Sequence, residues 1–93
     1  MPLSSGIAEQ MVEIETIRMP RLGIAMTEGA IVEWRKAEGE SIEEGELLLL
    51  IESDKAQIEI PSPCSGILEK ILAQVDEVIP VLEPIAQIRL LNS

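Results

Sequence analysis

The chain has 93 residues and a mass of 10.2 kDa, enough for one small domain with a thin hydrophobic core. It has no histidine and one cysteine, which excludes histidine-dependent catalysis, histidine-bearing zinc sites, an intrachain disulfide and thiolate clusters. The formal charge of −10 disfavours nucleic acid and anionic lipid, and no apolar run approaches the ~20 residues of a membrane helix. We therefore expect no metal site and no nucleic-acid or membrane partner.

Residues 1–12 are mostly small or polar and carry no periodic pattern, so we expect a flexible lead-in there and one domain over residues 13–91. From Arg18 onward, Gly and Pro recur between short apolar runs, which favours short strands joined by turns. The sequence predicts an all-β domain. The predicted strands are Thr16–Met19, Gly29–Lys36, Leu47–Glu52, Gln57–Ile60, Gly66–Leu72 and Ile85–Leu90.

An internal repeat relates the two halves of the chain at an offset of 37 residues, the spacing between Gly29 and Gly66. At this offset Ile42 falls on Ile79, and the strand that begins at Leu47 falls on the one that contains Ile85. Each copy is predicted to contain a strand, an acidic turn, a lone apolar residue, a second turn and another strand. Two such units would pack face to face as a sandwich with approximate two-fold symmetry.

The segment Glu46–Ile60 has a second interpretation, because it is rich in Glu, Leu, Lys and Ala, which are good helix formers. In a helix, however, Asp54 and Lys55 would fall in the apolar seam. The matching segment of the other copy also contains Pro80 and Pro84, which a helix interior does not tolerate. If the two copies fold alike, this segment forms strands.

Lys55 is the candidate functional residue, since it lies at the tip of the predicted hairpin between Glu52 and Gln57. Asp54 beside it is suited to capping a turn. Neighbouring acidic residues favour a protonated amine, so Lys55 is a poor free nucleophile. On composition alone, the favoured interpretation of Lys55 is an ordinary solvated turn lysine.

The residues around Lys55 resemble a known signature. Glu52-Ser53-Asp54-Lys55-Ala56 is similar to the Glu-Thr-Asp-Lys-Ala motif of lipoyl domains, the swinging-arm carriers of dihydrolipoyl acyltransferases. Gly39 and Gly66 stand at the family's distances before and after the lysine. Further matches extend the resemblance from about Ile17 to Ile88. They are Met19-Pro20-Arg21-Leu22-Gly23, Met26-Thr27-Glu28-Gly29, Gly45-Glu46-Leu47 and Pro61-Ser62-Pro63-Cys64-Ser65-Gly66.

The departures from the family pattern are mild. Ser53 replaces a more usual Thr, while Val75-Asp76-Glu77 and Leu82 stand where Gly-Asp and Gly are frequent. None of these differences alters the lysine at the tip, although a second turn with fewer glycines is expected to be stiffer.

The resemblance implies a flattened β-barrel or sandwich of two four-stranded antiparallel sheets related by a quasi-two-fold axis, a barrel-sandwich hybrid. It also implies lipoate in amide linkage to Lys55, with Asp54 and Ala56 as the turn flanks. Such a domain shuttles acyl groups and reducing equivalents between active sites of a 2-oxo acid dehydrogenase complex of pyruvate or acetoin type. In this family the loop from Gly23 to Met26 lies near the lipoyl turn and is a candidate for recognition by the decarboxylase component.

Two alternatives keep the same fold. A biotin carrier domain of a biotin-dependent carboxylase usually displays Met-Lys-Met, whereas the flanks of Lys55 are Asp54 and Ala56. An unmodified adaptor domain is the other alternative, and the intact Asp-Lys-Ala motif disfavours it. We expect no catalytic residues and no enzyme activity in the domain by itself, because the sequence holds no catalytic constellation.

The resemblance also implies a set of partners and a location. The parent protein would be a dihydrolipoyllysine-residue acyltransferase. The partners would be a lipoate ligase or lipoyl transferase, a thiamine-diphosphate-dependent 2-oxo acid decarboxylase, the acyltransferase core and dihydrolipoamide dehydrogenase. The expected location is the cytoplasm of a bacterium or archaeon, or the mitochondrial matrix in a eukaryote.

Overall fold

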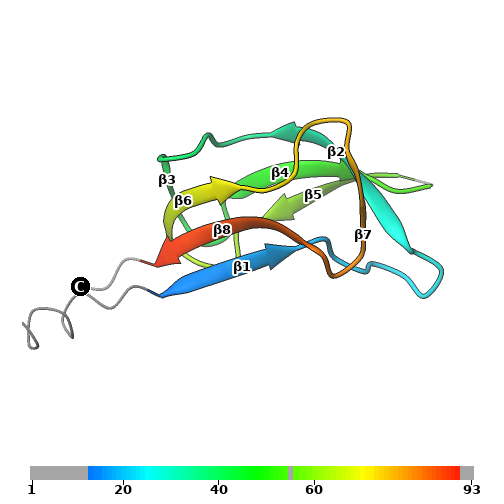
Figure 1. Cartoon of the computed structure of the whole chain (residues 1–93), viewed down its shortest axis with the longest axis horizontal. Coiled ribbons are helices and arrows are strands. Elements are labelled where there is room, and N and C mark those ends of the chain that lie inside the picture. The colour runs from blue at the N-terminus through cyan, green and yellow to red at the C-terminus, as the bar shows by residue number, and fades with distance from the viewer. Residues whose placement is uncertain (1–12, 55, 91–93) are drawn as a thin grey trace, which may run out of the picture.

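A computed structural model describes residues 13–54 and 56–90 and assigns eight strands among them (Figure 1). One antiparallel sheet has the order β1-β8-β6-β3 and is called here the β1 sheet; the other has the order β5-β4-β2-β7 and is called the β5 sheet. The strands are β1 (Ile14–Arg18), β2 (Glu28–Trp34), β3 (Ser41–Ile42), β4 (Leu47–Glu52), β5 (Gln57–Pro61), β6 (Gly66–Ile71), β7 (Val78–Pro80) and β8 (Pro84–Leu90).

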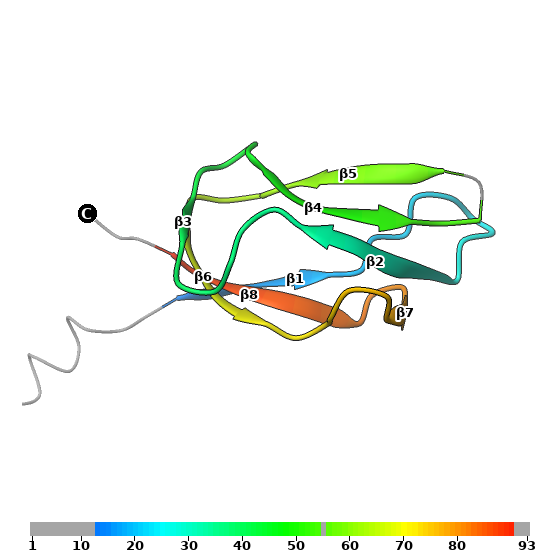
Figure 2. The same ribbon diagram turned by 90° about the horizontal axis from the view of Figure 1, so that it is seen from above.

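The sheets stack as a flattened sandwich and do not close into one barrel (Figure 2). This arrangement confirms the predicted all-β class and the two four-stranded antiparallel sheets. All six predicted strands are present, with ends that differ by at most two residues. The helical interpretation of Glu46–Ile60 is wrong, because that segment forms the β4–β5 hairpin. Residues 1–12 and 91–93 lie outside the described part of the chain, so the predicted lead-in and the C-terminal boundary stay predictions.

Two short strands were not predicted. β3 and β7 have two and three residues, and each contains the lone apolar residue of its repeat, Ile42 or Ile79. They pair with β6 and β2 at the edges of the two sheets. Strands this short show no alternation that a sequence pattern can detect.

The two halves repeat in register as well as in sequence. Ile31 of β2 lies opposite Ile51 of β4, and 37 residues later Leu68 of β6 lies opposite Ile88 of β8. A register shift follows immediately after Ile31 and after Leu68, so even the bulge is duplicated. The register therefore confirms the predicted repeat and its approximate two-fold symmetry.

The core lies between the two sheets and is aliphatic apart from Met19. Along β5, Ile58 and Ile60 alternate with exposed residues and pack against the core, as the sequence predicted. They are only half-buried, because β5 is an edge strand and has a neighbour on one side alone. The fully buried large side chains are Met19, Ile31, Leu48, Leu49, Ile51, Leu68, Ile85 and Ile88.

The molecule presents two distinct ends. β1 begins and β8 finishes at one end, whereas the β4–β5 connection lies at the other (Figures 1 and 2). Within the described residues, no helix is long and apolar enough to span a bilayer. The long axis of the sandwich thus separates the β4–β5 connection from the points where the chain enters and leaves the fold.

Candidate functional site

The β4–β5 hairpin carries the predicted site. Its last strand pair is Glu52 with Gln57, which leaves a four-residue connection over 53–56. The Ser53 N–H donates to the Ala56 carbonyl oxygen at 2.9 Å, and the Ser53 hydroxyl lies 3.4 Å from the same oxygen. This backbone bond closes the turn directly after the Leu- and Ile-rich strand β4, whose inward residues anchor the hairpin in the core.

The flanks of the predicted attachment residue lie in this connection. Asp54 and Ala56 are both exposed. Lys55 itself lies outside the described residues, and its role as the attachment residue stays a prediction. The residues on either side of it fit an attachment point, because the turn is closed and both flanking residues are exposed.

The loop between β1 and β2 faces this hairpin. The Met26 N–H donates to the Gly23 carbonyl oxygen at 3.1 Å, which folds the loop into a turn. The Leu22 N–H lies 3.4 Å from the Met26 sulfur. At the apex, Ile24 is 97% exposed.

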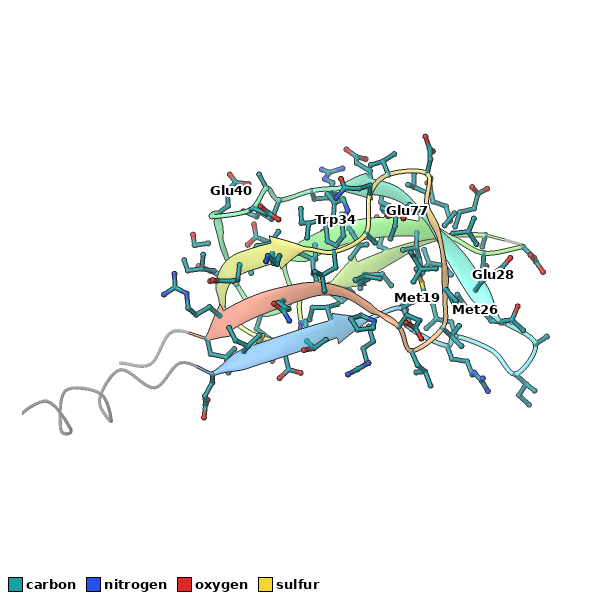
Figure 3. All side chains as sticks on the ribbon, viewed as in Figure 1. Met19, Met26, Glu28, Trp34, Glu40 and Glu77 are labelled. Atoms are coloured by element: carbon teal, nitrogen blue, oxygen red, sulfur yellow. The ribbon has the colours of Figure 1, made fainter. Side chains whose placement is uncertain are left out.

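The loop and the hairpin together line a groove of about 570 Å³. This finding confirms the expectation that the loop from Gly23 to Met26 lies beside the hairpin turn. Met26 and Glu28 mark this end of the molecule in Figure 3. The groove is lined by Leu22, Gly23, Ile24, Ala25, Met26, Thr27 and Glu28 from the loop side, and by Ser53, Asp54, Ala56 and Ile58 from the hairpin.

Sequence reasoning missed some of these lining residues. Ser53 was placed in the hairpin tip, Glu28 in the motif that precedes the strand Gly29–Lys36, and Ile58 in the strand Gln57–Ile60, but none of them was predicted to line a groove. Glu28 begins β2 directly after the loop, and Ile58 is the second residue of β5. Their closeness in sequence to the turn and the loop could have indicated these residues, because the ends of strands border the connections between them.

The other two lysines have different settings. Lys36 follows β2, and its Nζ lies 2.9 Å from the Glu46 carboxylate. The hydrogen bond to Glu46 raises the pKa of Lys36 above its ordinary value. Lys70 lies within β6, opposite Gln87. Neither lysine occupies a hairpin tip, which agrees with the sequence prediction that both lie in or beside strands.

Cys64 lies in the link between β5 and β6 and is half-buried against the core. Burial raises the pKa of its thiol, with smaller contributions from Glu15 and Glu44. A higher pKa keeps the thiol protonated and unreactive at neutral pH. Cys64 is therefore a packing residue.

Fold and site together define a small β-sandwich that displays the tight β4–β5 hairpin at the end opposite the start of β1 and the finish of β8. The chain belongs to the biotin/lipoyl family, whose model carries the description "Biotin-requiring enzyme" and matches residues 15–88. The family name refers to both biotin and lipoyl groups.

Similarity to curated relatives is more specific than the family match. The chain is 41% identical over 71 residues to the dihydrolipoyllysine-residue acetyltransferase component of the acetoin cleaving system of Pseudomonas putida. It is 44% identical over 72 residues to the same type of component in the pyruvate dehydrogenase complex of Corynebacterium glutamicum. These matches cover 76% and 77% of this chain, but only 19% and 11% of the relatives.

Solved structures with the same fold include both a lipoyl domain and a carboxylase. The lipoyl domain of the 2-oxoglutarate dehydrogenase complex from Azotobacter vinelandii superposes with a TM-score of 0.67 at 23% identity, covering 78% of this chain and 92% of that domain. The urea carboxylase of Kluyveromyces lactis superposes with a TM-score of 0.69 at 21% identity, covering 82% of this chain and 6% of the carboxylase. At these identities the likeness establishes the fold.

Proposed function

We propose that the chain is a lipoyl carrier domain and that Lys55 carries the lipoyl group in amide linkage. The observation that supports this most is the sequence Asp54-Lys55-Ala56 within a four-residue hairpin connection whose described flanks are exposed. When bound, lipoate supplies the chemistry that accepts acyl groups and electrons, and the protein supplies display and recognition. Names of the curated relatives, all dihydrolipoyllysine-residue acyltransferase components, favour the same group.

Biotin is the second candidate, because the family includes both groups and a carboxylase shares the fold. The flanks of Lys55 disfavour it. Biotin carriers usually present methionine on both sides of the lysine, whereas this chain presents Asp54 and Ala56. Mass spectrometry of the intact chain after co-expression with a lipoate ligase, and separately with a biotin ligase, distinguishes the two groups.

In this proposal the domain presents the carried group to partner active sites and does not itself catalyse a reaction. Tethering at the hairpin raises the effective concentration of the carried group at a partner active site, to the millimolar range for short flexible linkers. The partners are a lipoate ligase, a 2-oxo acid decarboxylase, an acyltransferase core and a dihydrolipoamide dehydrogenase. The groove beside exposed Ile24 is the proposed contact for the decarboxylase. The proposed location is the cytoplasm, or the mitochondrial matrix in a eukaryote.

The decisive variant is Lys55→Gln. Because both neighbours are exposed, we expect unfolding free energy to change by no more than ~0.5 kcal/mol. Lipoylation should be abolished, since Lys36 is ion-paired beside β2 and Lys70 lies within β6. Lys70→Gln serves as the matched control and should be lipoylated normally. Lipoate mapped to another lysine, or acyl transfer that survives in Lys55→Gln, contradicts the proposal.

A further inference from the structure

The outer face of the β5 sheet has an apolar centre. Because side chains alternate across a strand, Ala30 and Val78 face outward, whereas Ile31 and Ile79 next to them face the core. Ala30 and Val78 lie directly opposite each other across β2 and β7. Val78 is 55% exposed, and Ala30 is half-buried. The face therefore offers apolar surface to solvent where an outer sheet face is usually polar.

A hollow of about 200 Å³ lies over this centre. Ala30 and Val78 contribute its apolar part. Three carboxylates also line it: Glu28 from the start of β2, Glu52 from the end of β4 and Asp54 from the hairpin connection. Glu52 lies opposite Ala30, and Glu28 lies two residues before Ala30 on the same side of β2. The hollow thus combines an apolar floor with a negatively charged rim.

The equivalent face of the β1 sheet differs in charge. At the repeat offset, Ile67 and Ser41 replace Ala30 and Val78, and they lie opposite each other in the same way. Arg89 takes the place of Glu52 and forms an ion pair with Glu69 at 2.8 Å. The fold itself therefore does not require carboxylates at these positions. Of the ion pairs between described residues, none involves Glu28, Glu52 or Asp54.

We propose that the outer face of the β5 sheet docks a protein partner that inserts an arginine side chain into this hollow. The aliphatic part of the arginine packs over Ala30 and Val78, and the guanidinium faces Glu28, Glu52 and Asp54. Arginine suits the site better than lysine, because its planar guanidinium is weakly hydrated and offers five donors to several carboxylates. The net charge of −10 attracts a basic partner at longer range.

This surface borders the groove beside Ile24 and shares Glu28, Ser53 and Asp54 with it, but its centre at Ala30 and Val78 lies outside that groove. Docking there goes beyond the proposed carrier function. Its test uses the unmodified chain. Failure of lipoylation at Lys55 would therefore leave the docking surface standing, and failure of docking would leave the carrier function standing.

The test is a titration of the ¹⁵N-labelled chain with blocked Leu-Arg-Leu tripeptide, followed by backbone amide shifts. We expect the largest shifts at Ala30, Glu52 and Val78, with little change at Ser41 and Ile67 on the other face. Blocked Leu-Lys-Leu should bind more weakly, and the neutral citrulline analogue weaker still. Equal shifts over both faces, or equal affinity for arginine and citrulline, would overturn the proposal.

Variants separate docking from general attraction by negative charge. Glu28→Gln and Glu52→Gln should each lower affinity for Leu-Arg-Leu about two- to fivefold, the range for one exposed charge pair. Glu59→Gln is the matched control, because Glu59 lies on β5 opposite Leu50, outside the hollow, and carries the same charge. Loss of affinity in Glu59→Gln equal to that in Glu52→Gln contradicts a defined site.

A steric variant tests the hollow without changing charge. Ala30→Leu should fill the apolar floor and abolish the shifts caused by Leu-Arg-Leu, while the three carboxylates remain. Unchanged binding in this variant, with a native amide spectrum, overturns the proposed seat for the arginine. If Ala30→Leu does not fold, the comparison of Glu52→Gln with Glu59→Gln decides the question.

Discussion

Leu82 occupies, in the second half of the chain, the backbone position that Gly45 occupies in the first. The φ angle is +73° at Leu82 and +88° at Gly45, both in the left-handed region. The N–H of Leu82 donates to the Met19 carbonyl oxygen at 2.7 Å, and the N–H of Gly45 donates to the Ser62 carbonyl oxygen at 2.8 Å. The same turn is thus built once with the residue that suits it and once with a bulky residue that does not.

Replacing Leu82→Gly should stabilise the domain by about 0.5–1 kcal/mol. Leucine in the left-handed region costs roughly 1–2 kcal/mol, part of which is offset by the greater flexibility of glycine in the unfolded chain. Leu82 is 58% exposed, so little packing is lost. Urea unfolding followed by circular dichroism measures the change.

The reciprocal variant, Gly45→Leu, is the control. A Cβ at Gly45 would meet no heavy atom within 4 Å, so its cost is conformational and should be about 1–2 kcal/mol. Destabilisation by both variants would show that the side chain of Leu82 contributes packing that outweighs the strain.

The glycine pair that defines the repeat should respond unequally to alanine. At Gly66 a Cβ would collide with the Arg89 carbonyl oxygen of the neighbouring strand, which is backbone. At Gly29 it would come within 2.8 Å of the Met19 sulfur, which belongs to a flexible side chain. We expect Gly29→Ala to cost about 1–2 kcal/mol and Gly66→Ala 3 kcal/mol or more, since overpacking usually costs ~1–3.

Thermal unfolding of the two alanine variants, compared at equal protein concentration, checks this order. Equal destabilisation would mean that the β6–β8 backbone yields as readily as a methionine side chain. Gly39→Ala is a useful third variant, because its cost should be conformational only: φ is +92° and no atom lies within 4 Å of the new Cβ.

Trp34 ties the two sheets together. Its indole Nε1–H donates to the Ala73 carbonyl oxygen at 2.9 Å, from β2 to the segment that follows β6. Trp34→Phe should keep much of the apolar contact but leave that carbonyl without its donor, at a cost of about 1–2 kcal/mol. Urea denaturation followed by circular dichroism is the measurement, since the variant has no tryptophan fluorescence. No change in midpoint would show that solvent replaces the lost donor.

The carboxyl group of Glu46 should titrate at a lower pH than an ordinary glutamate. The pKa of Glu46 is lowered from its ordinary value of 4.5, first by the Glu43 N–H, which donates to its carboxylate, and second by Lys36. A lowered folded-state pKa contributes stability above the ordinary value, and this contribution is lost as pH falls through the folded-state pKa. ¹³C NMR titration of the carboxyl carbon reports it directly.

Lys36→Met should raise the pKa of Glu46 only partway to its ordinary value, because the Glu43 N–H still donates. Lys70→Met removes the same charge from β6 and should leave the Glu46 titration where it is. A full return to the ordinary value in Lys36→Met would show that the ion pair, and not the backbone bond, is the main cause.

Much of the fold could be read from local patterns. Gly29 and Gly66 mark the offset of the repeat, and the same offset relates the registers of both strand pairs. Prolines 80 and 84 excluded a helix in the second copy and, through the repeat, in the first. The hairpin around Asp54 and Ala56 follows from an apolar run, a turn residue and renewed alternation. These features depend on neighbours in sequence, which is why the sequence carries them.

Contacts between distant segments set the rest. β3 and β7 exist because the interior strands β6 and β2 are there to pair with, and no pattern of two or three residues predicts that. The groove beside Ile24 requires the β1–β2 loop to fold against a hairpin some 30 residues away. Glu52 and Val78 look like unrelated residues in the sequence, yet both lie next to Ala30 on one sheet face. Periodicity sets which face of a strand is buried, but strand order decides which outward side chains become neighbours. That order is fixed only when the two sheets pack against each other around one shared core.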